Sequence, residues 1–142
     1  MNTATELSRL LGPLRRTVLR ATRAAKDLPD LPEAQIELLR ALSEAGSLSP
    51  SDAARQLQVA PSTISNLTRR MIADRLVQRH TSDADLRAVT LTATAEAIEL
   101  LNLYDHASTE ILSEAISRLP PAEQKALTTA LPSLEHLLAE LH

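Results

Sequence analysis

The stretch APSTISNLTRRM, residues 60–71, decides the fold of this chain. On a helical wheel its apolar side chains gather on one side, opposite small hydroxyls, an amide and arginines. The polar face carries Ser62, Ser65, Asn66 and Arg69, with Thr63 and Arg70 at its edges. Ser, Thr and Asn are mediocre helix formers, so helix stability does not explain their presence. Because short hydrogen-bonding side chains allow close approach, and Arg and Asn suit bidentate contacts with nucleic acid, we expect a DNA-contacting helix. An ordinary solvent-exposed helix is the alternative.

A second short helix is expected directly before this one. In SLSPSDAARQLQV, residues 47–59, Ser49 is followed by Pro50 and by Asp52, which makes an acidic variant of the capping box with proline at the first helical position. This helix should run from Pro50 to about Leu57. Since Pro61 starts the next helix only three or four residues later, the pair is typical of a helix-turn-helix.

The helical period is lost in LVQRHTSDADLRAVTLT, residues 76–92. Apolar and polar residues alternate near both ends of this segment, and a polar, turn-rich SDADLR lies between them. Alternation predicts two strands joined as a hairpin. A hairpin after a helix-turn-helix gives a winged helix.

The rest of the chain has helical periodicity. We expect helices over about 3–26, where Gly12-Pro13 should kink or delay the helix, over 33–45 with Gly46 as a left-handed cap, and over about 93–119. A last helix follows Pro121, and Pro132 should kink or interrupt it. Its leucines recur at steps of four and three, at Leu127, Leu131, Leu134, Leu138 and Leu141.

These patterns define the expected organisation of a single chain, 1–142. The predicted fold class is mainly α with a small β-hairpin wing, a winged helix-turn-helix with N- and C-terminal dimerisation helices. Residues 31–92 form the DNA-binding part, and 1–26 and 93–142 form the dimerisation helices. Leucine stripes at both ends favour a partner subunit, with a monomer that folds one end onto the other as the alternative.

Composition narrows the classes of function. The formal net charge is −3, yet residues 1–26 carry six basic side chains against one acidic, and 55–87 carry six against three. Residues 93–142 carry two against eight, so a polyanion would meet the first two regions. The chain has no cysteine, which excludes disulfides and thiolate chemistry. We expect neither a signal peptide nor a membrane span, and hence a cytoplasmic protein.

The whole pattern resembles the MarR family of winged-helix transcription regulators. The matching segments are QIELLRAL (35–42), VAPSTISNLTRRMIADRLVQR (59–79), DADLRAVTLT (83–92) and LPPAEQKALTTAL (119–131). The resemblance implies a cytoplasmic repressor that binds double-stranded DNA, at a palindromic operator, as a homodimer held by its terminal helices. It places Ser62, Thr63, Ser65, Asn66, Arg69 and Arg70 in or beside the major groove, and Arg87 of the wing into or over the minor groove.

The resemblance also implies a small-molecule effector, often an aromatic acid, that releases the DNA. Any pocket for it would be aliphatic apart from Tyr104. Three residues depart from the family pattern: Arg75 and Ala95 replace common glycines, and Ala60 replaces a common serine cap, at a cost of about 1 kcal/mol.

Two other classes of function compete with this one. The first is a winged-helix module for protein partners without sequence-specific DNA binding, which the net acidic charge favours mildly. The second is an enzyme, and it finds no support: the four histidines lie at no metal-ligand spacing, and no phosphate loop or nucleophile motif is present. No catalytic residue, metal or cofactor is therefore expected.

Overall fold

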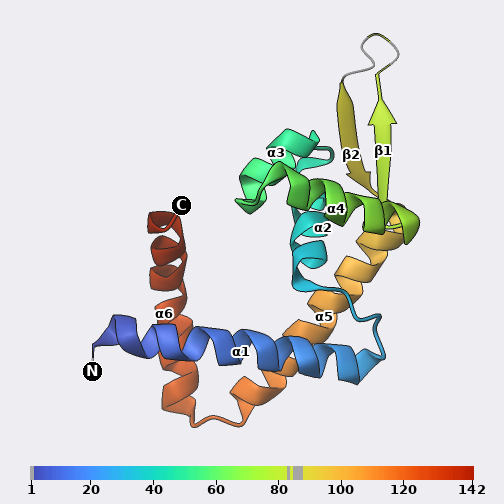
Figure 1. Cartoon of the computed structure of the whole chain (residues 1–142). Helices are drawn as coiled ribbons and strands as arrows, with labels where there is room; N and C mark the ends of the chain where they lie inside the picture. Colours follow the sequence, from blue (N-terminus) through green and yellow to red (C-terminus); the bar gives the residue numbers. More distant parts are fainter. Residues whose placement is uncertain (1, 83, 85–87) are drawn as a thin grey trace. The chain divides into compact units, whose positions relative to one another are not determined.

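The structure of the chain is a computed structural model that describes residues 2–82, 84 and 88–142. The described residues form six helices and one two-stranded antiparallel sheet (Figure 1). The elements are α1 (Thr3–Lys26), α2 (Glu33–Ala45), α3 (Pro50–Leu57), α4 (Pro61–Ala73), β1 (Val77–Thr81), β2 (Val89–Ala93), α5 (Ala95–Ser117) and α6 (Pro121–Glu140). The predicted fold class, mainly helical with a β-hairpin wing, is confirmed.

Contacts divide the chain into two compact units. One is Asp27–His106, and the other joins Met1–Lys26 with Ala107–His142. The winged helix, with the linker before α2 and the first half of α5, makes up the first unit. The second unit contains α1, the second half of α5 and α6.

The winged helix has an aliphatic core. Leu38, Leu39 and Leu42 of α2 are almost completely buried, as are Ile64 and Met71 of α4 and Leu91 of β2. Ala53 of α3 is also fully buried, and α3 packs on both α4 and α2. Burial of a Leu or Ile side chain contributes roughly 1.5–3 kcal/mol, so this cluster fixes α4 in place.

Local signals in the sequence set the ends of these helices. The hydroxyl of Ser49 accepts a hydrogen bond from the backbone N–H of Asp52 at 3.1 Å, and Pro50 occupies the first turn of α3. Gly46 ends α2 with φ of 83°, the left-handed conformation that glycine adopts at no steric cost. Gln58 ends α3 with φ of 56°, and α4 begins three residues later. The predicted helix-turn-helix is thus present.

The hairpin has a simple register. Val77 pairs with Ala93, Arg79 with Leu91 and Thr81 with Val89. Leu48 forms an isolated antiparallel bridge to Leu91, in which each residue donates its N–H to the carbonyl of the other at 3.1 and 2.7 Å. The bridge ties the base of the wing to the start of α3.

The first half of α5 is held against the rest of its unit by two adjacent residues. Tyr104 is buried, and its hydroxyl donates to the carbonyl of Pro29 and accepts from the N–H of Leu31. Asp105 accepts two hydrogen bonds from the guanidinium of Arg40 on α2, at 2.9 and 3.1 Å. The hydrogen bond to Asp105 raises the pKa of Arg40 above its usual value, because it favours the charged guanidinium.

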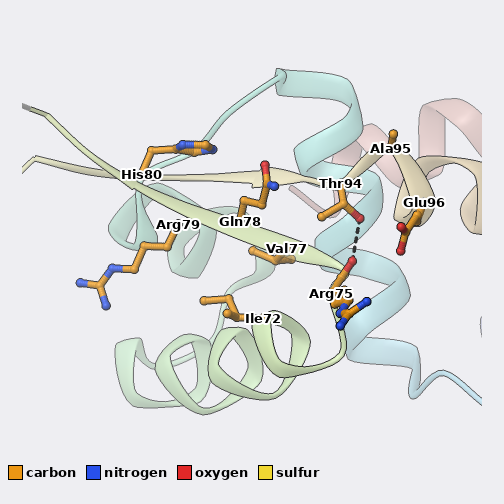
Figure 2. Close-up of a pocket in the computed structure, with 9 residues that line it drawn as sticks. All are labelled: Ile72, Arg75, Val77, Gln78, Arg79, His80, Thr94, Ala95 and Glu96. Carbon is orange, nitrogen blue, oxygen red and sulfur yellow. Dashed lines mark hydrogen bonds between the residues drawn. The ribbon is translucent and has the colours of Figure 1, made fainter.

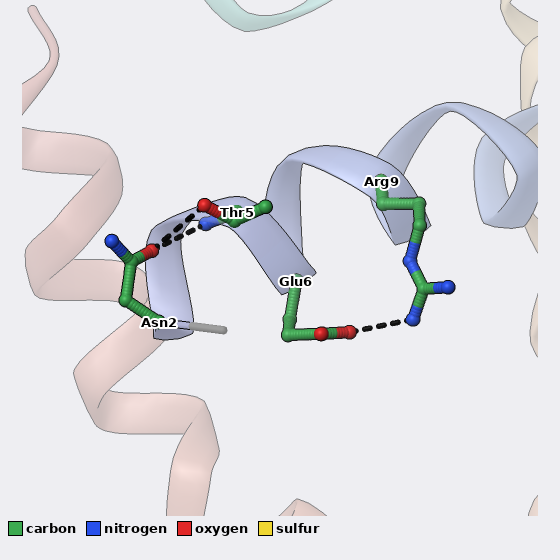
Figure 3. Close-up of polar contacts among 4 residues, drawn as sticks. All are labelled: Asn2, Thr5, Glu6 and Arg9. Atoms are coloured by element: carbon green, nitrogen blue, oxygen red, sulfur yellow. Dashed lines mark hydrogen bonds and ion pairs between the residues drawn. The ribbon is translucent and has the colours of Figure 1, made fainter.

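The first helix spans the range expected for it, and both terminal helices continue through their interior prolines. Asn2 caps α1, because its side-chain oxygen accepts from the N–H and from the hydroxyl of Thr5 (Figure 3). Pro13 lies inside α1 without delaying its start, and α6 runs without interruption through Pro132. An interior proline removes a single hydrogen-bond donor, and the turns on either side carry the helix across it. The expected delay and interruption were wrong, whereas a kink at either proline stays a prediction.

The second unit combines a buried polar contact with a large exposed apolar surface. Thr22 of α1 is fully buried, and its hydroxyl lies 3.0 Å from that of Ser108 on α5. By contrast, no residue of α6 is buried. Leu10, Leu11 and Leu14 of α1 are also about half exposed. Among the described helices, none is both long and apolar enough to cross a membrane.

Candidate nucleic-acid interface

Helix α4 presents two unlike faces. Its inner face is buried in the winged helix through Ile64, Thr68 and Met71. All six of its side chains expected to contact DNA are exposed, namely Ser62, Thr63, Ser65, Asn66, Arg69 and Arg70. The structure therefore brings these six residues together on one exposed helical face.

Thr68 is the polar residue of α4 that does not join this face. It is buried, and its hydroxyl donates to the carbonyl of Ile64 at 2.8 Å and lies 3.2 Å from that of Ser65. The helix backbone thus satisfies the hydroxyl within the core. A polar side chain within α4 is therefore not by itself evidence of a contact with DNA.

The exposed arginines differ in their surroundings. Arg70 lies 4.0 Å from Asp74, and Arg55 of α3 lies 3.1 Å from Asp52. Arg69 forms no ion pair with any residue that the structure describes, and neither does Arg79 of β1. Two cationic side chains near the polar face of α4 are therefore available to an anion.

Most residues between the two strands of the wing, 83 and 85–87, lie outside the described residues. Arg87, the expected wing contact, lies outside the described residues, together with Asp85 and Leu86. The described strands end at Thr81 and begin again at Val89. They project from the end of α4 (Figure 1).

Two cavities lie where α4 meets the hairpin. One, of about 410 Å³, is lined by Pro50, Ser65, Thr68, Arg69, Ile72, Arg79 and Leu91. The other, of about 680 Å³, is lined by Ile72, Arg75, Val77, Gln78, Arg79, His80, Thr94, Ala95 and Glu96 (Figure 2). Arg79 lines both cavities, although it was not among the residues predicted to contact DNA. No local signal in the sequence could have found it, because Arg79 faces this side only through the pairing of β1 with β2.

The three departures from the family pattern have visible structural outcomes. Arg75 keeps the left-handed conformation that a glycine would provide, with φ of 62°. Thr94 caps α5 in front of Ala95, since its hydroxyl accepts from the N–H of Ala97 at 3.0 Å. Ala60 makes no side-chain cap bond at the start of α4. The turns are thus formed without the usual residues.

Among the described residues, no cluster of three or more His, Asp or Glu side chains could hold a metal ion.

Part of the sequence matches a known protein family. Residues 30–88, which include α2, α3, α4 and β1, match the model of the MarR family. The segment from α2 to β1 is thus of the MarR family. The match identifies it as a transcription regulator with a DNA-binding type of winged helix, as the sequence pattern predicted. No curated protein matches the chain.

Solved structures of MarR-type proteins share the fold over the full length. YusO of Bacillus subtilis has a TM-score of 0.74 at 20% identity, with 96% of this chain and 99% of YusO covered. MepR of Staphylococcus aureus, a transcription regulator of the multidrug efflux pump MepA, has a TM-score of 0.76 at 19% identity, with both chains fully covered. A mutant of MepR, solved with a bound oligodeoxyribonucleotide, has a TM-score of 0.69 at 21% identity and full coverage of both chains. At these identities the likeness shows the fold alone.

Proposed function

We propose that this chain is a repressor that binds a palindromic operator as a homodimer. The observation that carries the proposal is the exposed face of α4, on which hydroxyls, an amide and two arginines stand over a buried apolar face. Such a helix fits the major groove, where Arg recognises guanine and Asn recognises adenine. The MepR mutant with bound oligonucleotide supports the proposal, since it has the same fold.

The apolar surface of the terminal helices supports the homodimer. Leu127, Leu131, Leu134, Leu137, Leu138 and Leu141, in and just after α6, are each more than 40% exposed. A monomer rarely leaves so many leucines on one helix in water, whereas a partner subunit would cover them. Dimerisation in turn supplies two copies of α4, which a two-fold symmetric operator requires.

Three finer parts of the proposal come from the family resemblance. These are the repressor role, the contact of Arg87 with the minor groove, and the release of DNA by a small-molecule effector. Each of them stays a prediction. The competing function is a winged-helix module for protein partners, which would leave the face of α4 indifferent to DNA sequence.

The test uses duplexes selected by the full-length chain from random sequence. We expect an inverted repeat with half-site centres about 10 base pairs apart, because two recognition helices enter major grooves on one side of B-DNA only at that separation. Inserting about 5 base pairs, half a helical turn, between the half-sites should reduce the affinity, at fixed physiological salt, to the non-specific level of roughly 10⁻⁴–10⁻⁶ M. Selection of direct repeats, or an insertion without effect, would contradict the dimer on a palindrome. Failure to select any sequence would favour the protein-interaction module.

A further inference from the structure

Arg79 occupies an unexpected side of the wing. In an antiparallel pair, directly opposed residues point to the same face, and Arg79 is opposed to Leu91, which is almost fully buried. Val77, two residues earlier on β1, is buried on that same face. Arg79 therefore stands on the inward, apolar face of the hairpin, although its own side chain is exposed.

The smaller cavity explains how a charged side chain is accommodated there. Arg79 lines it from β1, and Ser65 and Arg69 line it from the exposed face of α4. Leu91, Ile72 and Thr68 supply buried or partly apolar walls. None of the seven lining residues is acidic, and neither arginine has an ion-pair partner among the described residues. Two guanidinium groups thus line one cleft, and no described residue of its lining supplies a carboxylate to neutralise them.

We propose that this cleft between α4 and the hairpin binds a backbone phosphate of the DNA, and that Arg79 contacts that phosphate. The proposal rests on the proposed function, because the phosphate comes from the duplex that α4 recognises. A planar guanidinium binds phosphate through two parallel hydrogen bonds, which suits Arg better than Lys. Side chains that flank a helix in the major groove meet the sugar-phosphate backbone, so Arg79 positions the protein without selecting a base.

A purely structural role for Arg79 is the main alternative. An inward-pointing charge on a two-stranded sheet discourages pairing with another edge strand. The methylene stem of Arg79 would also cover apolar surface at Ile72. Either role predicts that loss of the charge changes stability or self-association, with no change in how DNA affinity depends on salt.

The experiment replaces Arg79 in the full-length chain and measures affinity for the selected duplex from low to physiological salt. Arg79→Leu keeps apolar bulk but removes the charge, and Arg79→Lys keeps the charge. We expect Arg79→Leu to lower affinity equally for the operator and for its single-base variants, and to reduce the log-log salt slope by about 1. Arg79→Lys should keep the wild-type slope. Gln78→Leu, on the same strand but the opposite face, is the matched control and should also keep it.

Two outcomes would overturn the inference while the proposed function stands. One is a wild-type slope and affinity for Arg79→Leu in a protein that still selects its operator. The other is a variant that melts at a lower temperature or self-associates, with unchanged affinity per folded dimer. If the wild-type chain selects no operator at all, the proposed function has failed. In that case Arg69→Ala and Asn66→Ala would be without effect too, which separates the two failures.

Discussion

Ser49 and Ala60 begin neighbouring helices with nearly the same backbone geometry, but only Ser49 supplies a side-chain cap. Ser49 has φ of −70° and ψ of 157°, and Ala60 has −67° and 149°. Proline follows both residues at the first helical position. The Ser49 hydroxyl accepts from Asp52 N–H, whereas the start of α4 has no side-chain acceptor.

This relationship predicts that Ala60→Ser stabilises the protein. A serine hydroxyl at position 60 would be placed to accept from the N–H of Thr63, as Ser49 accepts from Asp52. The free energy of unfolding should rise by about 1 kcal/mol, and Ser49→Ala should lower it by a similar amount. Denaturant titration measures both changes. Ser51→Ala is the control, because Ser51 is exposed one position beyond Pro50 and should change stability little. An Ala60→Ser protein no more stable than wild type would show that α4 needs no cap.

Arg69 and Asn66 should determine which sequence is bound. Loss of a good bidentate contact to a base reduces discrimination by roughly 1–3 kcal/mol. We therefore expect Arg69→Ala and Asn66→Ala to narrow the ratio of affinities between the operator and single-base variants of it. Fluorescence anisotropy with a set of such duplexes measures this ratio. Arg55→Ala, on neighbouring α3, is the control and should leave the ratio unchanged. If all three variants kept the wild-type ratio of affinities, the face of α4 would not recognise bases.

Tyr104→Phe tests the attachment of α5 within its unit. The substitution keeps the buried ring and removes only the hydroxyl, which leaves the carbonyl of Pro29 without its side-chain donor. The N–H of Leu31 still donates to the carbonyl of Pro29 at 2.9 Å, so neither backbone group is left without a hydrogen bond. We expect the free energy of unfolding to fall by about 1–2 kcal/mol. Tyr104→Leu should cost more because it also shrinks the core, and a Tyr104→Phe protein as stable as wild type would assign the whole effect to packing.

The helices and the hairpin were predictable from sequence because their signals are local. Ser49, Pro50 and Gly46 act within one turn of their own helix, and alternation over five residues suffices to indicate a strand. Pro13 does not delay its helix and Pro132 does not interrupt its own, since continuity across a proline depends on the turns around it. The exposed face of α4 was also readable, as a wheel separates its six polar side chains from Ile64 and Met71.

The sequence did not predict the position of a residue when that position depends on how two distant segments pair. Arg79 faces the cleft because β1 pairs with β2 at Leu91, and because Leu91 is bridged to Leu48. Nothing near Arg79 in the sequence specifies that pairing. Thr68 is a similar case, because only the packing of α4 shows that its hydroxyl is buried.

The dimer should be sensitive to charge on one face of α6. Leu131 and Leu138 are 54% and 59% exposed in the single chain, and their spacing of seven residues puts them on the same side of the helix. Burial against a partner contributes roughly 1.5–3 kcal/mol for each leucine, and a glutamate there would also lose its hydration. The combined Leu131→Glu and Leu138→Glu protein should therefore dissociate at least about a hundredfold more readily, since each 1.4 kcal/mol is about a factor of ten.

Sedimentation velocity at micromolar concentration measures this dissociation. Thr129→Glu is the matched control, because position 129 is also exposed but lies on the opposite side of α6 from the leucines. We expect that variant to sediment as a dimer, while the double variant sediments as a monomer. Because one protomer carries a single α4, the double variant should also bind an isolated half-site and the full operator with similar affinity. A wild-type chain that is monomeric and folded at micromolar concentration would refute the homodimer. A double variant that remains a dimer would place the interface elsewhere than on this face of α6.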